Sequence, residues 1–75
     1  MSTDITLVTA DDWEGLYVGD ELVEENHSLR VFDVLERLQY THIGSFMAFG
    51  VNDKWLQSEG SLPRFFSEIP EEMLK

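Results

Sequence analysis

The stretch Trp13–Glu25 constrains the fold most strongly, because it holds two partly apolar runs separated by a turn signal. Gly19 and Asp20 separate the runs, and glycine readily adopts the positive φ that a type II′ turn requires at its first central position. We therefore predict a hairpin with a two-residue loop. Its facing pairs are Val18 with Glu21, Tyr17 with Leu22, Leu16 with Val23, Gly15 with Glu24 and Glu14 with Glu25.

Both faces of this hairpin are predicted to be apolar. Alternation along the strands places Leu16, Val18 and Val23 on one face and Trp13, Tyr17 and Leu22 on the other. Each face therefore needs a cover from elsewhere in the chain. Glu14 opposite Glu25 would be a like-charge pair that costs a few tenths of a kcal/mol, and residues placed at a cost are candidates for function. Fraying at the open end of the hairpin, or a register shifted by one residue, would remove this cost.

The segments around the hairpin predict one further strand and one helix. Residues 4–9 alternate in the manner of a strand, with Ile5 and Leu7 on one face, and Ala10–Asp12 predict a reversal. Ser28 is the expected N-cap of a helix over Leu29–Tyr40, with Asn26 as the cap of a slightly longer alternative. Its apolar stripe is Val31, Val34, Leu35 and Leu38, and its surface ion pair is Asp33 with Arg37. Gly44 is expected to end the helical segment or the loop after it.

The C-terminal part begins with Ser45–Val51, the most apolar run of the chain. Because it is apolar on both faces, it predicts a central strand with a helix over one side. Asn52 or Asp53 is expected to cap a short helix, Lys54–Ser58, that Gly60 closes. Two single helical turns over residues 61–66 and 69–74 should then wrap the domain. Their expected anchors, with those of the short helix, are Trp55, Leu56, Phe65, Phe66, Ile69 and Leu74.

These elements together predict one α+β domain over residues 1–75. The sheet has about four strands, antiparallel or mixed, in β-β-β-α-β order over residues 4–9, 13–18, 21–25, 28–40 and 45–51. The main helix covers one sheet face, and the short C-terminal helical turns cover part of the other.

The acidic residues are concentrated near the N-terminus. The net charge is −10, and the first 29 residues hold eight acids and no lysine or arginine. Such a field repels nucleic acid and anionic membranes and attracts basic proteins. We therefore expect no direct binding to nucleic acid or membrane. The alternative is that the charge serves only solubility or salt adaptation.

Catalysis and metal binding receive little support from the sequence. The chain has no cysteine, and it has neither HExxH, EF-hand, GxSxG nor phosphate-loop spacing. His27 and His42 flank the predicted helix and would lie about 20 Å apart, too far to share a metal. We expect a non-enzyme without metal or cofactor. The absence of a signal-like start and of a long apolar run predicts a cytoplasmic, soluble protein.

The remaining function class is protein binding through the hairpin. Aromatic residues ringed by carboxylates are typical of an interface for a basic target. The candidate interface residues are Asp11, Asp12, Trp13, Glu14, Tyr17, Asp20, Glu21, Glu24 and Glu25. In general character the composition resembles the acidic nucleic-acid mimics of phages and mobile elements, which implies a basic, nucleic-acid-binding protein as partner. The alternative function is a structural subunit that forms a homodimer through the second apolar sheet face.

Overall fold

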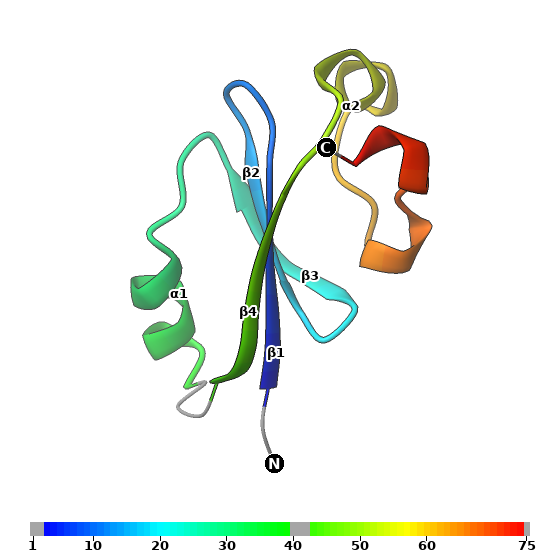
Figure 1. The fold of residues 1–75 in the computed structure, drawn as a ribbon. Coiled ribbons are helices and arrows are strands. Elements are labelled where there is room, and N and C mark those ends of the chain that lie inside the picture. Colours follow the sequence, from blue (N-terminus) through cyan, green and yellow to red (C-terminus); the bar gives the residue numbers. More distant parts are fainter. Residues whose placement is uncertain (1–2, 40–42, 75) are drawn as a thin grey trace.

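The computed structural model describes residues 3–39 and 43–74. Four strands form one mixed sheet in the order β3-β2-β1-β4 (Figure 1). Their bounds are β1 Thr3–Thr9, β2 Glu14–Val18, β3 Glu21–Asn26 and β4 Ile43–Gly50. β1 pairs antiparallel with β2 and parallel with β4, and the Ala10–Asp12 reversal lies between β1 and β2 as predicted. The α+β class and the β-β-β-α-β order are confirmed.

The second helix follows its capping signals closely. α2 (Asp53–Glu59) has Asn52 as N-cap, whose side chain accepts a hydrogen bond from the Trp55 backbone N at 2.9 Å. Gly60 ends it in the left-handed region with φ of 84°. Two 3₁₀ turns follow, η1 (Phe66–Glu68) and η2 (Glu71–Met73). Within the described ranges, no helix is long and apolar enough to cross a membrane.

The first predicted C-terminal turn lies later than expected. η1 begins at Phe66, whereas the sequence pattern placed a turn over residues 61–66. The cause is pairing with β3: Arg64 accepts a hydrogen bond from the Leu22 backbone N at 2.7 Å, and the Phe66 backbone N donates to Asp20 at 2.7 Å. These bonds keep the preceding residues extended along the sheet edge.

The first helix, α1 (Val31–Arg37), is shorter than predicted at both ends. Its N-cap is Arg30, without a capping side chain, and the predicted Ser28 cap is wrong. The reason is that the Leu29 backbone N donates to the Glu14 carboxylate at 2.8 Å, which holds the chain outside the helix. Helical geometry stops before Gln39, which has φ of 65°. Tyr40 lies outside the described residues.

Other details of α1 also differ from the pattern. Val34 and Leu35 are buried as expected, but Leu38 is 41% exposed because the helix ends before it. Gly44 lies within β4, so it ends neither the helical segment nor the loop after it. The predicted Asp33–Arg37 ion pair is replaced, since Arg37 pairs with Glu24 of β3 and Asp33 lies 3.9 Å from Arg30.

Two apolar clusters lie on opposite faces of the sheet. On one face, α1 covers Ile5 and Leu16 with Val34 and Leu35, and Leu7, Val18 and Val23 pack at the margin. On the other, the segment from α2 to Leu74 covers Val8 and Tyr17 with its buried Leu56, Leu62 and Ile69, and Trp13 and Leu22 pack against them. The predicted division of hairpin residues between two covered faces is confirmed. The face that suggested a homodimer is therefore already covered.

The hairpin register is as predicted near the turn and differs farther from it. Gly19 has φ of 62° and Asp20 does not have positive φ, which fits the type II′ turn. Val18 faces Glu21 and Tyr17 faces Leu22, but a bulge then makes Leu16 face Glu24. Glu14 consequently faces Asn26, so the predicted Glu14–Glu25 pair does not form and gives no hint of function.

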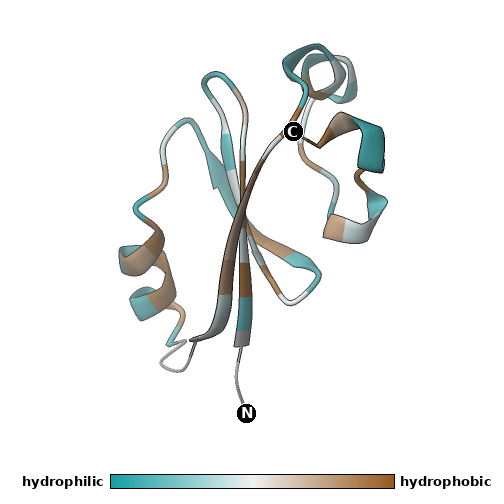
Figure 2. Ribbon diagram, in the orientation of Figure 1, coloured by the Kyte–Doolittle hydropathy of each residue, from teal (hydrophilic) through white to brown (hydrophobic). Residues whose placement is uncertain are grey.

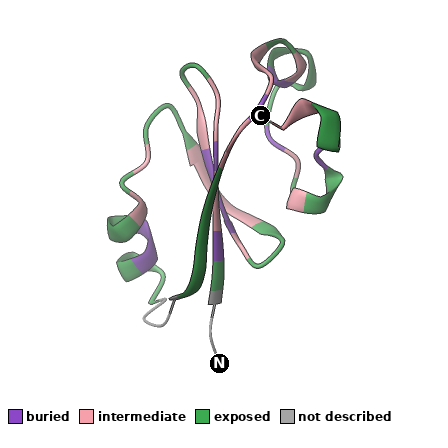
Figure 3. Cartoon of the chain, viewed as in Figure 1, coloured by how far each residue is buried: buried purple, intermediate pink, exposed green. Residues whose placement is uncertain are grey.

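β4 is an edge strand, so the predicted central position is wrong. β1 takes the central place between β2 and β4. Residues 44–48 of β4 are all exposed, as Figure 3 shows by its green colour. An apolar pattern on both faces does not distinguish a strand buried by the chain itself from one left open at an edge. The structure thus leaves residues 45–48, the first part of the most apolar run of the chain, accessible.

Candidate functional site

The turn between β1 and β2 carries two exposed carboxylates of the predicted interface, Asp11 and Asp12. The Ala10 backbone N donates to Trp13 at 2.7 Å and closes the turn. Asp11 and Asp12 are exposed at its tip. The Asp11 backbone N donates to the Asp53 carboxylate at 2.7 Å. This bond joins the turn to the first residue of α2 and fixes the position of both aspartates relative to that helix.

Trp13 is held in place by two neighbours. Its indole Nε1 donates to Glu25 Oε1 at 2.9 Å, and its ring meets the His27 ring edge-on with centroids 4.9 Å apart. The His27 Nδ1 lies 3.1 Å from the Asp12 carbonyl oxygen. The orientation of the Trp13 ring is therefore fixed by contacts within the chain.

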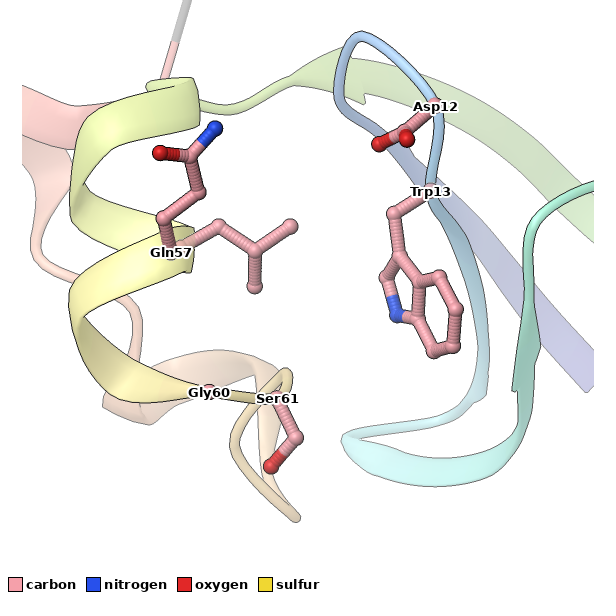
Figure 4. A pocket seen from close by; sticks show the side chains of 6 residues that line it. Asp12, Trp13, Gln57, Gly60 and Ser61 are labelled. Atoms are coloured by element: carbon pink, nitrogen blue, oxygen red, sulfur yellow. The ribbon is translucent and has the colours of Figure 1, made fainter.

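Trp13 forms one wall of a hollow of about 240 Å³, named here the Trp13 hollow. Its lining residues are Asp12, Trp13, Leu56, Gln57, Gly60 and Ser61. Figure 4 shows the indole facing α2 across the opening, with the Asp12 carboxylate at the rim. The hollow is smaller than the roughly 300–1,000 Å³ of small-molecule sites, which favours a single inserted side chain over a cofactor.

A second hollow lies beside the same turn. It measures about 290 Å³, and Thr9, Ala10, Asp11, Gly50, Val51 and Asp53 line it. Its carboxylates, Asp11 and Asp53, come from the turn and from α2. Asp11 and Asp12 therefore border two separate hollows at one end of the molecule.

Three other carboxylates of the predicted interface serve internal hydrogen bonds. Glu14 accepts from the Leu29 backbone N at 2.8 Å. Asp20 accepts from the Ser67 backbone N at 2.8 Å and from its hydroxyl at 2.7 Å, and thereby fixes η1 against the hairpin turn. Glu25 accepts from the Trp13 indole and, at 3.4 Å, from the Leu62 backbone N. These three groups are explained by the fold.

The last two carboxylates of the predicted interface form ion pairs within the chain. Glu24 pairs with Arg37 of α1, and Glu21 pairs with Arg64 at 3.3 Å. The β3 bulge places Glu24 on the α1 face, whereas Glu25 faces the Trp13 side of the sheet. The acids of β3 therefore do not form one continuous row.

Tyr17 is a core residue. Its side chain has no exposed surface, and its hydroxyl donates to the Pro63 carbonyl at 2.7 Å. Burial raises the pKa of Tyr17 above the ordinary tyrosine value, and the nearby carboxylates of Glu25, Asp20 and Glu68 raise it further. The ring packs edge-on against Phe66, with centroids 5.6 Å apart. A partner that docks on this surface does not touch Tyr17.

No metal centre is visible in the described part of the chain. Over residues 3–39 and 43–74, no group of three histidine or acidic side chains could hold an ion. His27 is exposed and packs against Trp13, and His42 lies outside the described residues.

The sequence pattern missed the α2 side of the Trp13 hollow. Leu56, Gln57 and Ser61 follow Trp13 by more than forty positions, and no local periodicity relates them to it. Locally, the sequence showed only the Asn52 cap and the Gly60 end of α2. These residues define the bounds of the helix but not its position beside Trp13. The comparisons with known proteins gave no match to any family model, curated protein or solved structure.

Proposed function

We propose that this chain is a non-enzymatic module that binds a basic protein, and that the Trp13 hollow receives an arginine or lysine side chain of that partner. The supporting observation is the combination of an indole wall and an aspartate rim in an opening about the size of one side chain. A guanidinium over an indole is attracted by the ring and can pair with a carboxylate beside it. The net charge of −10 steers such a partner toward the surface.

The arrangement of the acids favours recognition of single cationic side chains. An imitation of a nucleic-acid strand needs carboxylates at regular spacing, but Glu21 and Glu24 are engaged with arginines, and Glu24 and Glu25 lie on opposite faces. Asp12, at the rim of the Trp13 hollow, and its neighbour Asp11 are the carboxylates of the predicted interface whose side chains accept no hydrogen bond within the described residues. A nucleic-acid-binding partner remains within the proposal, because its basic surface offers the same side chains.

Tryptophan emission gives a direct test. In a Trp55→Phe background, Trp13 is the sole tryptophan, so its emission reports on the hollow. We expect an arginine-rich peptide to change this emission. Asp11→Asn with Asp12→Asn should weaken binding by about tenfold or more, because a charge-assisted contact is worth roughly 1.5–3 kcal/mol. The matched control is Glu71→Gln with Glu72→Gln, which removes two exposed charges elsewhere. Equal weakening by both pairs would contradict a specific site.

Partner capture tests the same proposal with natural ligands. The wild-type chain and the Asp11→Asn, Asp12→Asn variant are used as baits in a lysate of the cells that encode the protein, at low and high salt. We expect basic proteins that the variant loses and that salt releases. Excess duplex DNA should release those partners that bind the chain through their own nucleic-acid-binding surface, and should leave the other partners bound. Binding that is indifferent to salt and to both aspartates would refute the proposal.

A further inference from the structure

The two edges of the sheet are treated differently by the rest of the chain. The outer edge of β3 pairs with the C-terminal segment through the Leu22–Arg64 and Asp20–Phe66 backbone bonds. At β4, pairing starts only at Val51, which forms a bridge with Leu74. Within the described residues, nothing pairs with the outer edge over residues 45–49. Figure 1 shows this strand at the margin of the sheet.

The backbone groups that point outward from β4 can be assigned. The Val51 backbone N donates to the Thr9 carbonyl at 2.8 Å, so Val51 faces β1. Alternation along the strand makes Phe49, Met47 and Ser45 face β1 as well, while Phe46 and Ala48 direct their N–H and C=O groups outward. Gly44 is an extra residue in the pairing with β1 and ends the regular part of the strand. The open ladder is thus residues 45–49, with Met47 at its centre.

This open ladder lacks the features that usually protect a strand edge. It has no charged residue and no proline, although the chain as a whole has a net charge of −10. Phe46 is 45% exposed on the α1 face, and Met47 is 52% exposed on the other. Figure 2 shows the strand as brown, hydrophobic ribbon beside the central β1. Native edges normally carry lysine, proline or a covering segment that prevents pairing with another strand.

We propose that β4 pairs with β4 of a second copy of this chain, antiparallel and centred on Met47, so that two sheets become one continuous sheet. This is the symmetric pairing that uses the whole of residues 45–49. Phe46 then faces Ala48 of the second copy, and Ala48 faces Phe46, with each pair exchanging both backbone hydrogen bonds. The two Met47 side chains meet on the other face.

Two observations favour a second copy over an unrelated strand. The pairing is self-complementary in size, because a large aromatic residue lies opposite a small one in both pairs, which a two-fold axis requires. The charges are also placed favourably: eight of the fifteen acids precede Arg30, mostly on or beside the hairpin at the other side of the sheet, while residues 43–52 have none. A standard interface buries about 800 Å² per partner, and the contact between two β4 strands is smaller than this. We therefore expect a dissociation constant in the micromolar range.

Disulfide trapping tests the register. The chain has no cysteine, so Met47→Cys introduces the only thiol. The two cysteines would face each other in a non-hydrogen-bonded pair with Cα atoms about 4.5 Å apart, within disulfide range. We expect oxidation to give a covalent dimer. Ser45→Cys is the matched control on the same strand face, and its two copies would lie about 13 Å apart along the strand. Equal trapping of both variants would overturn this pairing.

Sedimentation of the unmodified chain tests the dimer itself. We expect the apparent mass to rise from one to two copies between low micromolar and near-millimolar concentration. Ala48→Pro removes one outward N–H but no bond to β1, and prolines are tolerated at such edge positions. It should raise the dissociation constant at least tenfold while the circular dichroism spectrum is retained. Phe65→Ser, an exposed aromatic at the other sheet edge, should leave dimerisation unchanged.

These outcomes are separable from the proposed function. A chain that stays monomeric at near-millimolar concentration, or a dimer that Ala48→Pro does not weaken, would overturn the inference. The Asp11→Asn, Asp12→Asn variant should dimerise as the wild type does, because the turn lies away from residues 45–49 of β4.

Discussion

Tyr17 illustrates how one side chain joins the hairpin to the C-terminal segment. Its hydroxyl donates to Pro63, and its ring contacts Phe66, so both sides of the chain depend on it. Because burial raises the pKa of the Tyr17 hydroxyl, the folded state holds this proton more tightly than the unfolded chain does. Its contribution to stability is therefore complete below about pH 10, the ordinary tyrosine pKa, and is lost as the pH rises above that value.

Tyr17→Phe tests this linkage. At neutral pH we expect a loss of about 1 kcal/mol in the free energy of unfolding, because the bond to Pro63 is removed. Above about pH 10 the wild type should lose stability more steeply than the variant, which has no hydroxyl to ionise at this position. Urea unfolding at several alkaline pH values measures both slopes. Parallel curves for the two proteins would contradict the assignment.

At the level of single residues, the sequence predicted which sheet face a side chain lies on better than it predicted which residue that side chain contacts. Leu16, Val18 and Val23 were correctly separated from Trp13, Tyr17 and Leu22, because strand alternation is a local property. The partners of the acids were not predictable. Glu14 binds the Leu29 backbone and Asp20 binds Ser67, and both contacts depend on how distant segments pack.

At the level of elements, the two helices show when capping signals suffice. Asn52 caps α2 through the Trp55 backbone N, whereas Ser28 does not cap α1, because Glu14 draws the Leu29 backbone N away. A capping residue is thus effective only if the following backbone is free to enter the helix. The same limit applies to β4, whose apolar pattern was correct although its place in the sheet was not.

Alanine substitutions at the two cap positions should differ accordingly. We expect Asn52→Ala to lower the free energy of unfolding by about 1 kcal/mol, the usual value of an N-cap. Ser28→Ala should change it by less than about 0.5 kcal/mol, the range typical of surface substitutions. Urea denaturation of both variants gives the comparison, and Asn52→Asp should restore the stability because it keeps the accepting oxygen. An equal cost at the two positions would show that Ser28 contributes to the helix start.

At the level of the whole molecule, the charge excess is larger than the ion pairs can balance. The three ion pairs found in the described part of the chain, Arg30–Asp33, Arg37–Glu24 and Arg64–Glu21, are at least partly exposed. Such pairs contribute little to stability. The repulsion among fifteen acids, offset by only five bases, acts on the compact state throughout the fold.

We therefore expect salt to stabilise the chain. Added salt weakens the repulsion among the acids more than it weakens the attraction within the few ion pairs. Tm should therefore rise as the sodium chloride concentration increases from about 0.01 M to about 0.15 M. Over this range the Debye length falls from about 30 to about 8 Å. A gain of about 1 kcal/mol would raise Tm by roughly 4–8 °C for a domain of this size. Calorimetry on Ala48→Pro, at low protein concentration, keeps dimerisation out of the measurement. The control, Glu71→Gln with Glu72→Gln in the Ala48→Pro background, has two acids fewer, so its Tm should rise less with salt. If Tm stays constant or falls as salt is added, the attraction within the ion pairs outweighs the repulsion among the acids.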